Sequence, residues 1–230
     1  MFEQLKRDDL RLVLMLDRFD LLLHRDNLNR SDFFGHLRTM ASSHYPSPLS
    51  LIITLNNSLH QFHQETATLN PLGSPYLNFL EAGVMTLGAL SETEIDELLH
   101  QRERFTEEDC RFIKEIAGGH PYLLQLAATI LWEAYDNDEE NPIESARKTF
   151  PDRVEGLLNN ILQTWSKNTC KAFLSVAQKH DVSGFKTELE ELEKQGFVVE
   201  DNNGAWRVRA SVFLSFVADK TEQELCGEED

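Results

Sequence analysis

Two uninterrupted apolar runs near the start of the chain constrain its fold more than any other feature. Residues 12–16 (LVLML) are followed by an acidic residue, and residues 49–55 (LSLIITL) are followed by two asparagines. Runs of this length are typical of strands that are buried on both faces. Ser31 can cap a helix between them, so the pattern predicts a βαβ unit with two parallel strands. Ligands bind at the carboxyl ends of such strands, which here are residues 17–20 and 54–57.

The charge balance excludes some classes of partner. The 230 residues carry 22 basic and 39 acidic side chains, for a formal net charge of -17. Such a chain repels phosphate backbones and anionic lipids, which argues against nonspecific binding to nucleic acid or membrane.

Three features bear on the compartment. No stretch approaches the roughly 20 apolar residues of a membrane helix, and the first residues lack the apolar region of a secretory signal. Cys110, Cys170 and Cys226 are widely spaced and indicate neither a disulfide framework nor a paired-cysteine metal site. We therefore expect a cytoplasmic protein.

Helix-start and helix-stop signals dominate the middle of the chain. Residues 91–94 (SETE) form a capping-box pattern, and residues 106–109 (TEED) open a second helix that stops at two glycines. Pro121 suits the first turn of a third helix, which continues to Tyr135. Residues 84–87, which lie between two glycines, are expected to form a third short strand.

Residues 136–142 are charged, poor in apolar side chains and end in proline, so we expect a domain boundary there. Three helical patterns follow, at residues 154–165, 168–178 and 185–195. Two short strands then flank residues 201–204 (DNNG), a turn rich in residues that tolerate left-handed backbone. Three helices followed by a β-hairpin is the order of a winged-helix domain.

Several of these features occur in the order found in one group of ATPases. Residues 12–20 (LVLMLDRFD) resemble a Walker B segment with a Phe-Asp extension, and residues 51–57 (LIITLNN) resemble the sensor 1 strand. Residues 74–90 resemble the fifth strand and the entry to the lid, and residues 118–125 (GGHPYLLQ) resemble the glycine-x-proline motif of the lid. The chain thus resembles the carboxyl-terminal portion of a STAND-type AAA+ ATPase.

The resemblance implies a mostly α-helical α/β protein in four parts. Residues 1–90 would form a partial parallel sheet of the P-loop-NTPase kind, and residues 91–140 a helical lid. Residues 141–219 would form the winged-helix domain, and residues 220–230 an acidic tail.

The resemblance also implies ATP or ADP with Mg²⁺ as the cofactor. Asp17 would hold the metal opposite the phosphates, and Thr54 and Asn56 are the candidates for sensor 1 near the γ-phosphate. Four lid residues would face the nucleotide at a helix N-terminus: Gly118, Gly119, His120 and Pro121. No residue is assigned as catalytic.

Each of these residues also has a simpler interpretation. Asp17 could be a turn carboxylate at a strand end, and Thr54 and Asn56 could make ordinary strand-end hydrogen bonds. His120 could be a partly exposed loop histidine. Asp20 is better explained as a cap of the following turn than as a metal ligand.

The chain departs from the family in two ways. Arg18 stands where a catalytic glutamate is often found, and arginine cannot act as a base because it stays protonated. No GxxxxGK[ST] motif is present, so the strand that carries it, at the centre of the family's sheet, is missing. The protein could begin upstream of Met1, the remaining strands could pair directly, or another chain could supply the missing piece. Exposed sheet edges in the second case predict dimerisation or poor solubility.

Three functions therefore compete. The first is part of a regulatory ATP-binding switch, in which the nucleotide state positions lid and winged helix to control an effector or an assembly. The second is a nucleotide-free degenerate ATPase that acts as a protein-interaction scaffold. The third is a winged-helix DNA-binding regulator that uses Arg207 and Arg209, which the net charge disfavours. We expect protein partners or self-assembly, and neither nucleic acid nor membrane.

Overall fold

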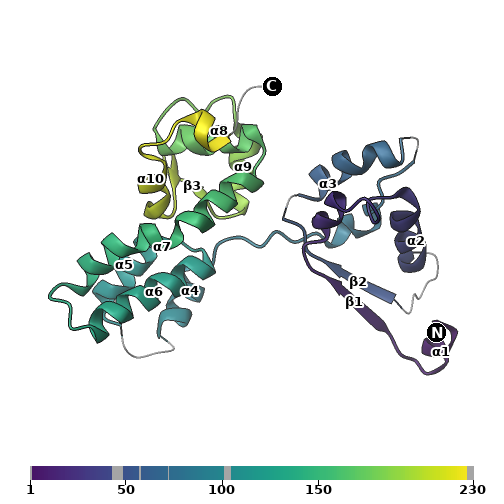
Figure 1. The fold of residues 1–230 in the computed structure, drawn as a ribbon, viewed down its shortest axis with the longest axis horizontal. Helices are drawn as coiled ribbons and strands as arrows, with labels where there is room; N and C mark the ends of the chain where they lie inside the picture. The colour runs from purple at the N-terminus through teal and green to yellow at the C-terminus, as the bar shows by residue number, and fades with distance from the viewer. Residues whose placement is uncertain (1, 43–48, 57, 72, 101–104, 227–230) are drawn as a thin grey trace. The chain divides into compact units, whose positions relative to one another are not determined.

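The computed structural model describes residues 2–42, 49–56, 58–71, 73–100 and 105–226. These residues are mostly helical, with one parallel and one antiparallel pair of strands among them. The chain divides into two compact units, residues 1–85 and residues 86–230, which are described separately (Figure 1). Within the described ranges, no helix combines the length and apolar character that crossing a membrane requires.

The first unit contains the expected parallel strand pair. β1 (Leu12–Leu16) pairs with β2 (Leu49–Ile53), and the register runs from Leu12 opposite Leu49 to Leu16 opposite Ile53. The crossover between the strands includes the helix α2 (Ser31–Ser42), as the βαβ pattern predicted (Figure 1). The other elements of this unit are short: α1 (Phe2–Arg7), the 3-10 helices η1 (Phe19–His24), η2 (Ala67–Leu69) and η3 (Asn78–Gly83), and α3 (Leu59–Thr66).

An aromatic cluster forms the core of the first unit. The Phe34 ring of α2 lies 6.0 Å from the Phe19 ring, 5.9 Å from Phe62 and 5.4 Å from Tyr76, between ring centroids. These rings come from four separate segments, so their contacts tie the strands to the surrounding helices.

One face of the sheet is covered in part, and the other is exposed. Leu16, Leu51 and Ile53 pack against the aromatic cluster. Side chains alternate along a strand, and those on the opposite face, Met15 and Ile52 among them, are 72% and 51% exposed. The prediction that both faces of the strands are buried is therefore wrong within the described residues.

Residues 84–87 do not form the expected third strand. Residues 84–90 carry neither helix nor strand, because a short apolar segment becomes a strand only beside another strand with which it can hydrogen-bond. The segment instead runs to the second unit, where the Leu90 amide donates to the Gly119 carbonyl at 2.8 Å.

The second unit consists mainly of helices around one continuous apolar core. In chain order, the described helices and strands of this unit are: α4 (Glu92–His100), α5 (Glu107–Ala117), α6 (Pro121–Asp136), α7 (Pro142–Thr164), α8 (Lys167–Ala177), α9 (Lys186–Lys194), β3 (Val198–Glu200), β4 (Trp206–Val208), α10 (Ser211–Val217) and α11 (Glu222–Cys226).

Several local predictions in this unit are confirmed. Ser91 and Glu94 exchange capping hydrogen bonds at the start of α4, and Thr106 and Asp109 form a capping box on α5. β3 and β4 form the expected antiparallel hairpin, with Val198 opposite Val208.

The described residues contain one boundary between compact units. It falls between residues 85 and 86, whereas residues 136–142 join α6 to α7, whose buried side chains share one core. Asn141 accepts a hydrogen bond from the Glu144 amide, and Pro142 then begins α7. The charged, proline-ended pattern therefore marks a tight connection between helices within one unit.

The expectation that the cysteines form no disulfide is wrong. Cys170 of α8 is bonded to Cys226 of α11 across a sequence separation of 56 residues, and Cys110 is a free thiol. The last helix therefore packs against the unit, and Leu225 is buried. The sequence did not indicate this disulfide, because contacts between residues far apart in the chain depend on the complete fold.

Candidate functional site

The carboxyl ends of β1 and β2 bring Asp17 and Thr54 together. The Thr54 hydroxyl donates to Asp17 Oδ1 at 2.5 Å and accepts from the Arg18 amide at 2.8 Å. Among the described residues, Thr54 is the one hydrogen-bond partner of the Asp17 carboxylate. Both side chains are exposed, so the carboxylate can accept a further ligand from solvent.

Arg18 makes this arrangement possible through its backbone. Its φ and ψ are 49° and 51°, in the left-handed region that residues other than glycine seldom adopt. This conformation reverses the chain after β1, and the Phe19 amide then donates to the Thr54 carbonyl at 2.9 Å. The strand end is thus closed by hydrogen bonds from two successive amides, those of Arg18 and Phe19, to the same threonine.

Asp20 does not cap the following turn as expected. Its two carboxylate oxygens accept from the backbone amide and the side-chain amide of Asn56, at 3.2 and 3.0 Å. Asp20 is buried, and buried polar groups are stabilised when hydrogen-bonded. The backbone and side-chain N–H groups of Asn56 therefore make a structural contact. Its side-chain oxygen is the group that a ligand would meet.

The side-chain oxygens of Asp17 and Thr54 fit a Mg²⁺ ion whose remaining ligands are waters and substrate phosphates. Mg²⁺ is usually bound by one or two carboxylates, with waters and substrate phosphates completing the shell. Asp17 supplies one carboxylate and Thr54 a neighbouring hydroxyl. No group of three acidic, histidine or cysteine side chains with metal-binding geometry occurs among the described residues, so a tight all-protein metal cage is not formed there.

The glycine-rich turn between α5 and α6 serves first to cap two helices. Gly118 has a φ of 60° and ends α5, where its amide donates to the Lys114 carbonyl. His120 is the N-cap of α6, and its Nδ1 accepts from the Leu123 amide at 3.4 Å. Pro121 fills the first helical position. Burial lowers the pKa of His120 below its usual range, which keeps Nδ1 free to accept that hydrogen bond.

Gly119 allows the connecting segment to pass close to this turn. A side-chain carbon at Gly119 would lie 2.6 Å from the Ala89 methyl and 2.7 Å from the Leu90 carbonyl oxygen. Gly196, in the turn between α9 and β3, has a φ of 84° and would meet Ala89 in the same way. Two turns that are distant in sequence thus hold residues 88–90 between them.

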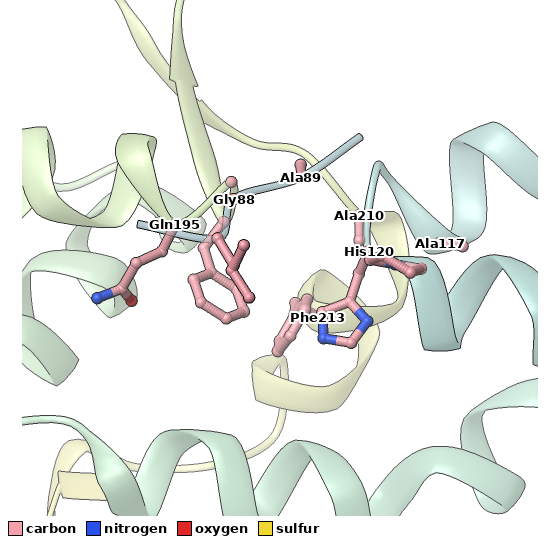
Figure 2. A pocket seen from close by; sticks show the side chains of 11 residues that line it. Gly88, Ala89, Ala117, His120, Gln195, Ala210 and Phe213 are labelled. Atoms are coloured by element: carbon pink, nitrogen blue, oxygen red, sulfur yellow. The ribbon is translucent and has the colours of Figure 1, made fainter. Parts of the chain in front are cut away.

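A cavity of about 240 Å³ lies beside this segment in the second unit. Figure 2 shows the His120 imidazole next to the Phe213 ring of α10, with Gly88 and Ala89 of the connecting segment close by. Gln195 adds a polar group at the end of α9. The cavity wall is otherwise mainly apolar and comes from four parts of the sequence, which are residues 87–89, 117–121, 195–197 and 210–213.

The structure separates the predicted site residues into two groups. Asp17, Thr54 and Asn56 lie in the first unit, and the residues of the 118–121 turn lie in the second. Of that turn, His120 and Pro121 line the cavity. Sequence analysis missed Phe213 and Gln195, because an apolar ring and an amide in helical patterns carry no signal of their own. A comparison with protein-family models, curated proteins and solved structures finds no match.

Proposed function

We propose that this chain is part of a regulatory ATP-binding switch of the STAND-type AAA+ kind. In this proposal, the nucleotide state sets the position of lid and winged helix and thereby controls an effector or an assembly. The observation that carries the proposal is the cavity beside His120. Its wall combines residues 87–89, the turn between α5 and α6, the turn after α9 that includes Gln195, and the start of α10 with Phe213.

A ligand-driven switch requires a binding site whose wall comes from separate segments of the chain. A ligand can shift a conformational equilibrium only by the difference in its affinity for the two states. A group bound in this cavity contacts four segments at once, so any movement between them changes its contacts. Occupancy of the cavity therefore favours one arrangement of these segments.

The cavity is suited to a planar, partly polar group. Phe213 offers an aromatic ring, and His120 and Gln195 offer polar side chains in an otherwise apolar wall. Pockets for drug-sized ligands are typically about 300–1,000 Å³, so about 240 Å³ admits a nucleobase rather than a whole nucleotide.

Asp17 and Thr54 are the residues that would hold Mg²⁺. The metal would neutralise part of the charge on the nucleotide phosphates when bound. A loop that cradles the phosphates is supplied, in this proposal, by polypeptide outside these residues. Hydrolysis is not part of the proposal, because Arg18 cannot act as the base that the family places there.

The test is a titration of the chain with a fluorescent ATP analogue, with and without Mg²⁺. Asp17→Ala should abolish the Mg²⁺-dependent part of the affinity, whereas Asp26→Ala, which removes another exposed acid of the same unit, should not. His120→Asn keeps an N-cap residue but removes the imidazole, and should weaken binding about tenfold, which corresponds to about 1.4 kcal/mol. His180→Asn, at an exposed position, is its control.

The second candidate is a nucleotide-free scaffold, and two contacts favour it. The Asn56 side-chain amide is bound to Asp20 and His120 caps its own helix, so both residues have structural roles without a ligand. This candidate predicts that Mg-ATP leaves the melting temperature unchanged, since a ligand that binds only the folded state must raise it. Absence of binding at millimolar nucleotide would decide for the scaffold.

DNA binding is the least supported of the three functions. The helix before the hairpin, α9, carries four glutamates in nine residues. Negative side chains there repel a phosphate backbone. Arg207 and Arg209 on and after β4 do not offset this charge, and we do not propose a nucleic-acid partner.

A further inference from the structure

The edge of β1 that faces away from β2 has no strand beside it among the described residues. The Thr54 amide donates to the Leu16 carbonyl, so the polar groups of Leu16 point toward β2. Backbone groups alternate along a strand, and those of Val13 and Met15 therefore point away from β2. Within the described residues, no further strand pairs with β1. Exposed edges of this kind are templates for pairing with another strand.

The side chains around this edge are also uncovered. Met15 is 72% exposed, Val13 49% and Leu14 37%. The strand contains no charge, proline or glycine, which are the features that usually prevent edge pairing. An added strand would cover both the backbone groups and part of these side chains.

We propose that two copies of this chain associate by antiparallel pairing of β1 with β1, centred on Leu14. The pairing has two-fold symmetry, so each contact occurs twice. Leu12 of one copy lies opposite the partner's Leu16, and Val13 lies opposite the partner's Met15. In this register, each of the five residues of β1 lies opposite a residue of the partner's β1.

Charge complementarity selects both the register and the partner. With Leu14 at the centre, Arg11 lies opposite the partner's Asp17 at each end of the paired strands. Arg11 and Asp17 are exposed, directly flank β1 and carry opposite charge. By alternation they point to the same face of the sheet. Opposite charges on facing residues stabilise a strand pair. A shift of either strand by one position breaks both charge pairs.

The hydrogen-bond pattern is compatible with the same register. Because the polar groups of Val13 and Met15 point outward, each would exchange two hydrogen bonds with its counterpart in the other copy. Leu14 would then form a non-hydrogen-bonded pair with the partner's Leu14 on the two-fold axis. The Cα atoms of such pairs are about 4.5 Å apart.

The first test is sedimentation over a concentration series, without nucleotide or Mg²⁺, so that its outcome does not depend on the proposed function. The wild-type chain should form a dimer. Arg11→Asp places an acid opposite the partner's Asp17 at each end of the paired strands. It should raise the dissociation constant of the dimer at least tenfold. The double variant Arg11→Asp with Asp17→Arg should restore it. Arg25→Asp, the same charge change elsewhere in the first unit, should not alter it.

The second test measures the register by cross-linking. In a Cys110→Ser background, Leu14→Cys should form a disulfide between two copies under oxidising conditions. A Cα separation of about 4.5 Å lies within the range of about 4.4–6.8 Å that disulfides need. Val13→Cys should cross-link far more slowly, because each cysteine would then face the partner's Met15. A wild-type chain that stays monomeric, or equal cross-linking at both positions, would overturn the proposal.

Discussion

Thr54 donates a hydrogen bond to Asp17 across the ends of two neighbouring strands, with 2.5 Å between Oγ1 and Oδ1. The two residues are 37 positions apart in the sequence, and the parallel register of β1 and β2 brings them together. The same hydroxyl accepts from the Arg18 amide, so one side chain links the carboxylate to the left-handed turn that follows it.

Removal of this hydroxyl should loosen the turn. In Thr54→Val, the Arg18 amide loses its acceptor, and its hydrogen exchange should become about 2- to 10-fold faster, in line with a net hydrogen-bond contribution of about 0.5–1.5 kcal/mol. Thr54→Ser keeps the hydroxyl and should exchange at the wild-type rate. Exchange measured by NMR distinguishes the two, and equal rates in both variants would show that the hydroxyl does not hold the turn.

Gly119→Ala should destabilise the second unit by about 1–3 kcal/mol, because its methyl group would enter the space of Ala89 and force a backbone shift. Gly156→Ala is the matched control. Gly156 lies inside α7 with no atom near an added methyl, so alanine should stabilise the helix by up to about 1 kcal/mol. Denaturant unfolding gives both values. Destabilisation by both substitutions would contradict the packing of Ala89 and Leu90 against the turn.

His120 should make the second unit sensitive to acid. Because burial lowers its pKa in the folded state, the unfolded chain takes up a proton at a higher pH than the folded chain does. The stability that depends on neutral His120 is therefore present above the usual histidine pKa of about 6.5, and is lost as the pH falls below it. Protonated Nδ1 also cannot accept from the Leu123 amide.

The variant His120→Asn isolates this effect, since asparagine can cap a helix without titrating in this range. The difference in unfolding free energy between wild type and His120→Asn should be constant above neutral pH and should change in favour of the variant as the pH falls. A difference that does not vary with pH would show that His120 titrates alike in both states.

Loss of the disulfide between Cys170 and Cys226 should lower the stability of the second unit. Cross-links that close loops of this size typically contribute about 2–4 kcal/mol. Cys226→Ser should show that loss in denaturant unfolding, and a reductant should have the same effect on the wild type. Cys110→Ser removes the free thiol and keeps the disulfide, so a reductant should still lower its stability. Titration of three free thiols in the unfolded, unreduced protein would contradict the bond.

The local elements were largely predictable because their signals lie within a few residues. The two apolar runs predicted β1 and β2, and the turn at 201–204 predicted the hairpin. The pairs Ser91–Glu94 and Thr106–Asp109 predicted two helix starts. Residues 84–87 were predicted wrongly because strand formation depends on a neighbour, and no sequence window reports whether one is present.

The sequence by itself determined where most of the helices and strands form and which polar residues stand at the ends of β1 and β2. These outcomes follow from the side-chain period, from capping hydrogen bonds and from the backbone preferences of glycine and proline. The tertiary structure decided that Asp20 binds Asn56, that Gly119 and Gly196 enclose Ala89, that Cys170 bonds Cys226 and that a cavity opens beside His120. Each of these depends on the distance between residues far apart in the chain, and packing of the complete unit sets that distance.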